Sequence, residues 1–307
     1  MSDPTYAIIV NPASNTGRLK KKWLKVLPKV EEKFKEYDQA FTWHFTEAPL
    51  QSKEIAEGLW NEGIRNFIAV GGDGIANELG NWILENNKDI PLGVVPMGTS
   101  NDMHITLNMP MDPIENFDLV LNGEPKPYPV GKATGDFNGS GAAYFLNHSD
   151  CGLSSLAAKS SRDGWKIIKG EFKYTFHALK QLTKFRRNQA RITIDGEAKE
   201  LDLTVFAAGF GEGMGGYKLW PDNSIDKNGF GIVLAYGQSR FQLLKLMLAA
   251  EKGKHIGKPG VEYTRGKKIE IELDREWPFQ AEGEMYTENS QKVEFEYVPN
   301  AIKYYTE

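Results

Sequence analysis

The sequence predicts a two-domain protein, with an α/β domain over residues 1–127 and a β-sandwich domain with inserted helices over residues 128–307. Three observations support this. The chain has 307 residues, 40% of them hydrophobic. This length suits two domains better than one. Strand-like and helix-like patterns alternate in its first third, which is typical of a doubly wound, mostly parallel sheet. Turn residues gather at Asn122–Pro127, and extended patterns dominate beyond them.

The first domain begins with a strand and a long helix. Tyr6–Val10 is an apolar run, and a polar loop, Asn11–Arg18, follows it. From Leu19 to about Tyr37 the apolar residues recur at helical spacing, and Pro28 should kink or divide this helix. The start of the helix is strongly basic, which fits either a solvated face or attraction to an anionic surface.

Three further strands complete the predicted sheet. They are Phe41–Phe45, Phe67–Val70 and Ile90–Pro96, with helices expected over Ser52–Trp60 and from near Ile75. In parallel sheets, ligands bind beyond the carboxyl ends of the strands. The loops that start at Asn11, Thr46, Gly71 and Gly98 all leave strands at that end, so we expect them to converge at one edge.

The most informative stretch is Asn66–Glu78, which reads NFIAVGGDGIANE. Its order is strand, glycine-rich turn and helix. Glycines let backbone N–H groups approach an anion, and the positive end of a helix favours the same ligand. Because Asp73 repels a bare phosphate, it indicates either a metal ion or a cap on the turn. A plain tight turn is the simpler alternative.

The second domain is predicted to be rich in strands. Asp195-Gly196 is typical of a two-residue hairpin, and helices are expected over Gly170–Phe185 and Arg240–Glu251. The expected strands are Ala142–Asn147, Ala190–Ile194, Leu201–Ala208, Gly231–Tyr236, Lys268–Leu273 and Lys292–Tyr297.

Three segments of this domain have two interpretations each. Phe241–Ala250 is apolar nearly all round, which fits a core helix or contact with lipid. The glycine-hinged loop Met214–Trp220 either gates a cleft or forms a corner of the sandwich. Ala281–Glu284 places two carboxylates around a glycine, which gives a desolvated general base or an exposed turn.

Composition excludes several classes of protein. The formal net charge of −4 argues against a general nucleic-acid binder. The single cysteine, Cys151, cannot form an intramolecular disulfide, so no oxidising compartment is needed. The N-terminal residues lack the pattern of a signal peptide, and no apolar run approaches the ~20 residues that span a bilayer. We therefore expect a cytoplasmic protein.

Taken together, the motifs resemble the diacylglycerol kinase catalytic-domain family, which includes soluble bacterial lipid kinases and sphingosine kinases. The resemblance covers nearly the whole chain, and its N-terminal motifs are the more specific. The matching residues are Asn11-Pro12 with Gly17, Thr46, Gly71–Gly74 with Asn77-Glu78, Pro96-x-Gly98-Thr99-x-Asn101-Asp102, Gly215-Gly216, Asp226 and Glu282-Gly283-Glu284.

The resemblance implies an ATP-dependent lipid kinase that uses Mg²⁺ and transfers the γ-phosphoryl group to a lipid hydroxyl. Glu282 and Asp73 would be the catalytic residues, and Asp73, Asp102 and Asp226 would be metal ligands. The nucleotide site would comprise Asn11, Pro12, Ser14, Gly17, Thr46, Gly71, Gly72, Asp73, Gly74, Asn77, Glu78, Gly98, Thr99 and Asn101. The implied partners are a lipid substrate, a peripheral membrane surface and a second copy in a homodimer.

The sequence departs from the family pattern in four places. Glu282 replaces the usual Asp, Ile75 replaces a Thr, and Pro129–Lys132 lacks an acidic residue that often opens the second domain. The segment Ser224–Gly229 resembles a structural magnesium loop but is one residue longer. These departures leave two alternatives open: a kinase of a soluble substrate similar to the NAD kinases, and a nucleotide-binding protein without turnover.

Overall fold

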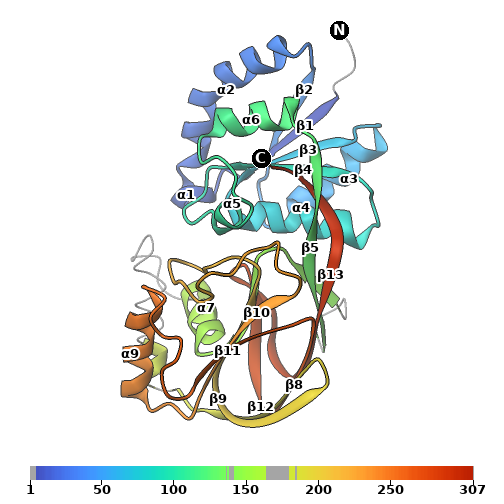
Figure 1. Ribbon diagram of the computed structural model, residues 1–307. Helices are drawn as coiled ribbons and strands as arrows, with labels where there is room; N and C mark the ends of the chain where they lie inside the picture. Colours follow the sequence, from blue (N-terminus) through green and yellow to red (C-terminus); the bar gives the residue numbers. More distant parts are fainter. Residues whose placement is uncertain (1–4, 136, 138–141, 164–179, 184, 307) are drawn as a thin grey trace. The chain divides into compact units, whose positions relative to one another are not determined.

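The computed structural model describes residues 5–135, 137, 142–163, 180–183 and 185–306 (Figure 1). The chain forms two compact units. The N-terminal unit comprises Met1–Pro129 and Pro299–Glu307, and the C-terminal unit comprises Val130–Val298. The predicted helix over Gly170–Phe185 lies largely outside the described residues. No described helix is both long and apolar enough to cross a membrane.

A parallel sheet forms the centre of the N-terminal unit. Its strands are β1 (Tyr6–Val10), β2 (Phe41–Phe45), β3 (Asn66–Gly71) and β4 (Pro91–Pro96), in the order β2-β1-β3-β4. The end of β13 (Glu284–Tyr305) adds a parallel partner to β4, with Lys303 opposite Pro91. The four predicted strands are therefore confirmed to within one residue.

Helices lie against both faces of this sheet (Figure 1). On one face, α2 (Leu19–Glu36) and α6 (Pro113–Asn122) bury Trp23 and Phe117 against the side chains of β1 and β3. On the other face, α4 (Asp73–Glu85) packs Trp82 against Phe67, with ring centroids 5.1 Å apart. Pro28 lies inside α2 and does not divide it. The remaining helices of this unit are α1 (Ser14–Gly17), α3 (Gln51–Asn61) and α5 (Asp102–Thr106).

The C-terminal unit is built mainly from antiparallel strands. β9 pairs with both β7 and β8, each of which also pairs with β12, while β10 and β11 extend from the other side of β9. The strands are β5 (Pro125–Gly135), β6 (Ala142–Phe145), β7 (His148–Gly152), β8 (Asn188–Ile194), β9 (Glu197–Gly209), β10 (Phe230–Tyr236), β11 (Val261–Gly266), β12 (Lys268–Ala281) and β13.

Two described helices accompany these strands, α7 (Leu153–Asp163) and α9 (Arg240–Ala250). Aromatic rings fill the core, and Phe206 stacks on Phe295 at 5.3 Å. The predicted hairpin at Asp195-Gly196 is confirmed: both residues have positive φ, and Ile194 pairs with Glu197.

The structure corrects the sequence prediction in two places. Pro125–Pro127, expected to be a turn, begins β5, because proline fits the first residues of a strand. The segment His148–Asp163 was not assigned an element, yet it forms β7 and then α7. β7 is polar in sequence, and its five residues are all buried, so neither strand alternation nor an apolar run marks it.

Candidate functional site

The four loops predicted to converge do so at the carboxyl edge of the parallel sheet. Backbone hydrogen bonds extend the strand pairing into each loop. The N–H of Asn11 donates to Val70 at 3.0 Å, that of Thr46 to Val10 at 3.0 Å, and that of Met97 to Gly71 at 2.7 Å. The edge of the sheet therefore carries one continuous set of ordered loops.

Glycines allow two of these loops to touch through their backbones. A Cβ atom on Gly98 would lie 2.4 Å from the Cα of Gly72. A Cβ atom on Gly71 would lie 2.8 Å from a methyl carbon of Ile75 and 3.1 Å from the hydroxyl of Ser14. Contacts under 3 Å force the neighbours to shift, so Gly71 and Gly98 are required by packing.

Gly74 differs from these glycines because, in the part of the chain that the structure describes, no atom lies within 4 Å of the place where its Cβ would be. Its φ angle is not positive. Gly74 lies in the first turn of α4, whose N-cap residue, Gly72, is extended and provides no side-chain cap. The N-terminus of α4 therefore presents backbone N–H groups beside open space, which is the arrangement that binds phosphate groups.

Asp73 binds the neighbouring loop. One carboxylate oxygen accepts the N–H of Asp102 at 3.2 Å, and the other accepts the N–H of Met103 at 3.0 Å. Asp73 thus caps α5 rather than its own turn. Burial raises the pKa of Asp73 above its usual value, against the opposing effect of these N–H groups. In the same loop, Asn101 has a φ of 52°, and its side chain accepts the N–H of Gly98 at 3.0 Å.

The side chains of Asn77 and Glu78 accept hydrogen bonds from other residues of the same unit. The Glu78 carboxylate accepts the N–H of Leu50 at 3.4 Å and the hydroxyl of Ser52, so it holds the start of α3. Leu50 needs this support because its φ is 64°. The side-chain oxygen of Asn77 accepts from Asn81 one turn later, at 2.8 Å.

The other predicted nucleotide residues lie in the loops at the same edge. Asn11 accepts the N–H of Ala13 at 3.0 Å through its side chain, and Ser14 begins α1. Gly17 ends α1 with a φ of 79°, which favours glycine. Thr99 is exposed. Pro12 is half-buried between Asn11 and Ala13.

In the C-terminal unit, Glu282 lies at the tip of the β12–β13 hairpin. Glu282 and Gly283 both have positive φ, 52° and 84°, between the paired residues Ala281 and Glu284. The Glu282 side chain is only 2% exposed. The turn itself is exposed at Gly283 and Glu284, but the Glu282 carboxylate is buried. An L-residue in this conformation costs roughly 1–2 kcal/mol, which other contacts must offset.

Three backbone N–H groups supply that compensation. They belong to Leu146, Asn147 and His148, and they donate to the same oxygen of Glu282 at 3.0, 2.6 and 3.2 Å. The second oxygen lies 3.7 Å from Nδ1 of His148. Burial lowers the pKa of His148 to about 3, so the imidazole is neutral and this contact is no ion pair.

Sequence reasoning missed a polar chain beside this turn. Asp150, fully buried on β7, accepts the Ser154 hydroxyl at 2.5 Å and a hydrogen bond from the amide of Gln280. The oxygen of that amide accepts the N–H of Gly283 at 2.7 Å. Burial raises the pKa of Asp150 to about 7. Because Asn147, His148 and Ser149 beside it are polar too, no pattern in the sequence marked Asp150 as buried.

Ser154 also lines an apolar cavity of about 100 Å³ in this unit. Strands β9 and β10, the loop Met214–Leu219 and the inner side of α9 form its other walls. The cavity is apolar except near Ser154 and His255. The loop Met214–Trp220 is therefore part of a cavity wall, and Trp220 itself is buried.

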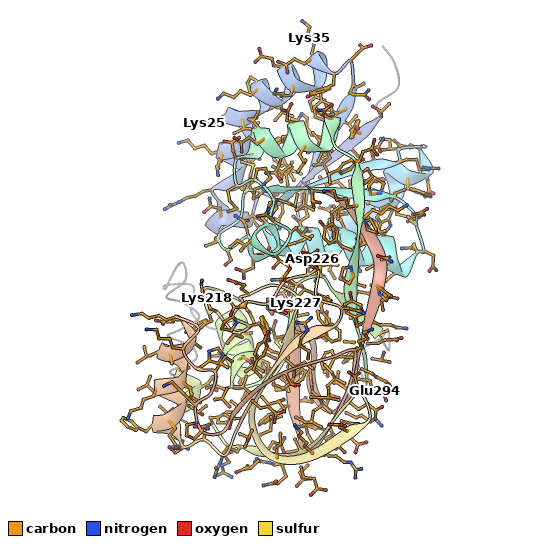
Figure 2. The ribbon with its side chains drawn as sticks, in the orientation of Figure 1. Lys25, Lys35, Lys218, Asp226, Lys227 and Glu294 are labelled. Carbon is orange, nitrogen blue, oxygen red and sulfur yellow. The ribbon has the colours of Figure 1, made fainter. Side chains whose placement is uncertain are left out.

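Metal binding fits the N-terminal unit better than the C-terminal unit. Among the described residues no three His, Cys, Asp or Glu side chains are grouped to hold a metal. Mg²⁺ in kinases needs only one or two carboxylates besides the phosphates, and Asp73 and Asp102 are the carboxylates of this edge that could serve as ligands. Asp226 does not fit: it is exposed and accepts the Ser224 hydroxyl, while the Lys227 ammonium binds the Asp222 carbonyl (Figure 2).

Comparison with known proteins assigns both halves of the chain. Residues 5–133 match the diacylglycerol kinase catalytic domain, and residues 150–306 match the YegS C-terminal NAD kinase beta sandwich-like domain. Diacylglycerol kinase from Staphylococcus carnosus is 28% identical over 278 residues, covering 90% of this chain and 87% of that protein. Its counterpart from Staphylococcus aureus (strain MRSA252) is 29% identical, covering 90% and 85%.

Solved structures agree with this assignment at the level of the fold. A crystal structure of a diacylglycerol kinase from Bacillus anthracis superimposes with a TM-score of 0.74 and 21% identity. The match covers 100% of this chain and 98% of that one. The catalytic-domain and β-sandwich matches together span nearly the whole sequence, and we conclude that this chain belongs to the diacylglycerol kinase family of ATP-dependent lipid kinases.

Proposed function

We propose that this kinase transfers the γ-phosphoryl group of ATP to a hydroxyl of diacylglycerol or a closely related lipid. The observation that carries the proposal is the apolar cavity of the C-terminal unit, with Ser154 in its wall and a polar chain running from Ser154 to the Glu282 turn. Apolar walls suit acyl chains, because these have no polar groups that need hydrogen-bond partners. The names of the Staphylococcus relatives favour the same lipid.

The loops at the sheet edge of the N-terminal unit would hold the nucleotide. Gly71, Gly72 and Gly74 bring backbone N–H groups to the phosphates, and Asp73 and Asn101 fix the loop 97–103 beside them. Asp73 and Asp102 would hold Mg²⁺, which would neutralise negative charge on the phosphates when bound. Phosphoryl transfer depends mainly on such positioning.

Glu282 would act on the acceptor. Its first oxygen accepts three backbone N–H groups, and we propose that its second oxygen accepts the proton of the substrate hydroxyl. As the lipid oxygen bonds to the γ-phosphorus, its proton passes to Glu282 and the bond to the β-phosphate oxygen breaks, releasing ADP. Because the imidazole of His148 is neutral, it places no positive charge beside this carboxylate. We place the enzyme at a membrane surface, where its substrate resides.

The proposal is tested by the identity of the acceptor. Purified protein would be incubated with labelled ATP, Mg²⁺ and mixed micelles containing diacylglycerol, monoacylglycerol, a sphingoid base or an isoprenoid alcohol, and separately with NAD. We expect label on diacylglycerol or a glycerolipid close to it. Label on NAD alone, or ATP hydrolysis that is indifferent to every lipid, would show that the proposed acceptor is wrong.

A further inference from the structure

The outer side of α9 exposes apolar side chains to solvent. Phe241 is 66% exposed and Leu248 is 56% exposed. They are seven residues apart, which places them on one stripe of the helix, two turns from each other. The inner side of α9 is covered: Leu243 and Ala250 are buried, and Leu246 and Met247 line the apolar cavity with them. This helix therefore has apolar side chains on two opposite sides.

Positive charge surrounds the exposed apolar stripe. Residues 240–258 contain five basic side chains and one acidic one, Glu251, whereas the whole chain has a net charge of −4. The Lys245 ammonium lies over the Phe241 ring, 4.5 Å from its centroid, so its stem covers the ring and its charge stays outside. Lys218, whose N–H donates to the Ala250 carbonyl, lies at the other end, and its ammonium is 3.8 Å from the Glu212 carboxylate (Figure 2).

A basic pocket lies beside the N-terminus of α9. It has a volume of about 450 Å³ and includes Ser239, the residue that caps the helix, and Leu243. Among the described residues that line it, Asp202 is the only carboxylate, and it pairs with Arg187 at 3.0 Å. The pocket keeps an excess of positive charge from Arg186, Arg187, Arg240 and Arg275.

We propose that α9 and this arginine pocket form a docking surface for an anionic lipid bilayer. Phe241 and Leu248 would enter the interface, while the arginines and lysines would bind anionic headgroups. A second copy of this chain is the less favourable occupant, because a two-fold interface would bring two basic surfaces together. An acidic bilayer complements both the charge and the apolar stripe.

This inference rests on the proposed function in one respect. The helix that would lie in the interface also forms a wall of the cavity proposed for the acyl chains. A lipid would therefore meet the docking surface and the cavity wall on opposite sides of one helix. Docking itself requires no ATP and no catalysis, so it can be measured separately from the kinase reaction.

The first test places a polarity-sensitive fluorophore on Leu248→Cys. Cys151, the one native cysteine, is fully buried, and burial raises the pKa of its thiol, so the introduced cysteine is the site that reacts. The probe should shift to shorter wavelength with vesicles of phosphatidylcholine plus phosphatidylglycerol, and less with phosphatidylcholine alone. The matched probe on Leu24→Cys, 49% exposed on α2, should not shift.

The second test measures vesicle sedimentation without ATP. With roughly 1 kcal/mol per basic residue at the surface, Arg186→Gln with Arg240→Gln should lower the partition coefficient about 25-fold. Phe241→Ser with Leu248→Ser should lower it about tenfold or more. Lys21→Gln with Lys22→Gln on α2, an equal loss of exposed charge, should change it by less than about twofold. Thermal unfolding of each variant confirms that it is folded.

Three results would overturn the docking surface. They are no binding to either kind of vesicle, binding that depends on Lys21 and Lys22 instead of α9, and a fluorescence shift at Leu248 that appears with rising protein concentration and no vesicles. The last result would assign the surface to a second copy. Phosphorylation of a short-chain diacylglycerol dissolved below its micelle concentration would still report on the proposed function in each case.

Discussion

At the scale of single residues, a substitution at Gly74 should have opposite effects on the stability of the fold and on nucleotide binding. No atom of the described residues lies within 4 Å of the place where its Cβ would be, and its φ angle is not positive. Gly74→Ala should therefore raise the free energy of unfolding, by up to about 1 kcal/mol, because alanine is the better helix former. The same methyl group fills the space proposed for the phosphates, so ATP affinity should fall about tenfold or more.

Gly58 is the matched control for this prediction. It lies in α3, and a Cβ atom there also meets nothing within 4 Å. Gly58→Ala should give a similar gain in stability, measured by thermal unfolding, with unchanged ATP affinity, measured by calorimetry. If Gly74→Ala binds ATP as tightly as Gly58→Ala does, the N-terminus of α4 is not the phosphate site.

Asp150 should make stability depend on pH near neutrality. Its folded pKa of about 7 lies above the ordinary value of 3.8, so between these values the folded state binds more protons than the unfolded state. Its contribution to stability is therefore present below about pH 4 and is lost as pH rises through 7. Asp150→Asn stays neutral throughout this range.

Chemical unfolding at pH 5 and pH 8 tests this dependence. The stability of Asp150→Asn relative to wild type should improve at pH 8, by an amount on the order of a few kcal/mol. Gln280→Glu would place a second carboxylate beside Asp150 and should deepen the loss of stability at pH 8. Equal pH profiles for wild type and Asp150→Asn would show that the carboxyl group does not titrate in this range.

The roles of individual site residues were harder to foresee than their positions. The sequence placed Gly71 to Gly74 and Gly98 at one edge of the sheet, because strand ends and glycine spacing are local features. That Asp73 caps α5, or that Glu78 holds α3, depends on contacts between residues about 30 positions apart. That the N–H groups of residues 146–148 bind one oxygen of Glu282 likewise depends on contacts between distant parts of the chain.

At the scale of elements, the loop between Asp222 and Gly229 is stabilised by cations of the protein itself. The Lys227 ammonium binds the Asp222 carbonyl, and Arg265 donates to the carbonyls of Lys227 and Gly229 at 2.8 and 2.7 Å. These groups occupy the carbonyl oxygens that a metal ion would use. In this loop, which has one residue more than the magnesium loop that it resembles, the Lys227 ammonium and the Arg265 guanidinium bind these carbonyls.

We therefore expect this loop to need no metal. Exhaustive EDTA treatment of the nucleotide-free protein should leave its melting temperature unchanged to within about 1 °C. Arg265→Met should lower the free energy of unfolding by about 2 kcal/mol or more, because the partly buried carbonyl of Gly229 and side-chain oxygen of Asn223 lose their donor. A large fall in melting temperature with EDTA, reversed by Mg²⁺, would contradict this account of the loop.

The elements differ in how well the sequence predicted them. The strands of the parallel sheet are short apolar runs between turn residues, and their bounds were predicted closely. β7 was missed because His148, Ser149 and Asp150 are polar yet fully covered by β9 and β12. A polar strand that is buried on both sides has no signature in a single sequence, since its burial comes from strands far along the chain.

At the scale of the whole molecule, the features that suit phosphate groups and those that suit a lipid lie in different units. The N-terminal unit has ordered glycine loops and an uncapped helix N-terminus, which suit phosphates. The C-terminal unit has an apolar cavity and a buried carboxylate, which suit a lipid and its hydroxyl. The family assignment joins these features in one reaction, the phosphorylation of a lipid by ATP.

The most direct test of this account is the rate of one turnover in wild type and in Glu282→Gln. Glutamine keeps an oxygen for the three N–H groups of residues 146–148 but cannot accept a proton. With enzyme in excess over labelled ATP, and diacylglycerol in mixed micelles, wild type should transfer the label to the lipid. Glu282→Gln should do so about 100-fold or more slowly, with unchanged ATP affinity.

Glu272→Gln, an exposed change on β12, is the control and should match wild type. Equal rates in Glu282→Gln and wild type would contradict the role proposed for Glu282, and no labelled lipid from wild type would contradict the proposed transfer to diacylglycerol.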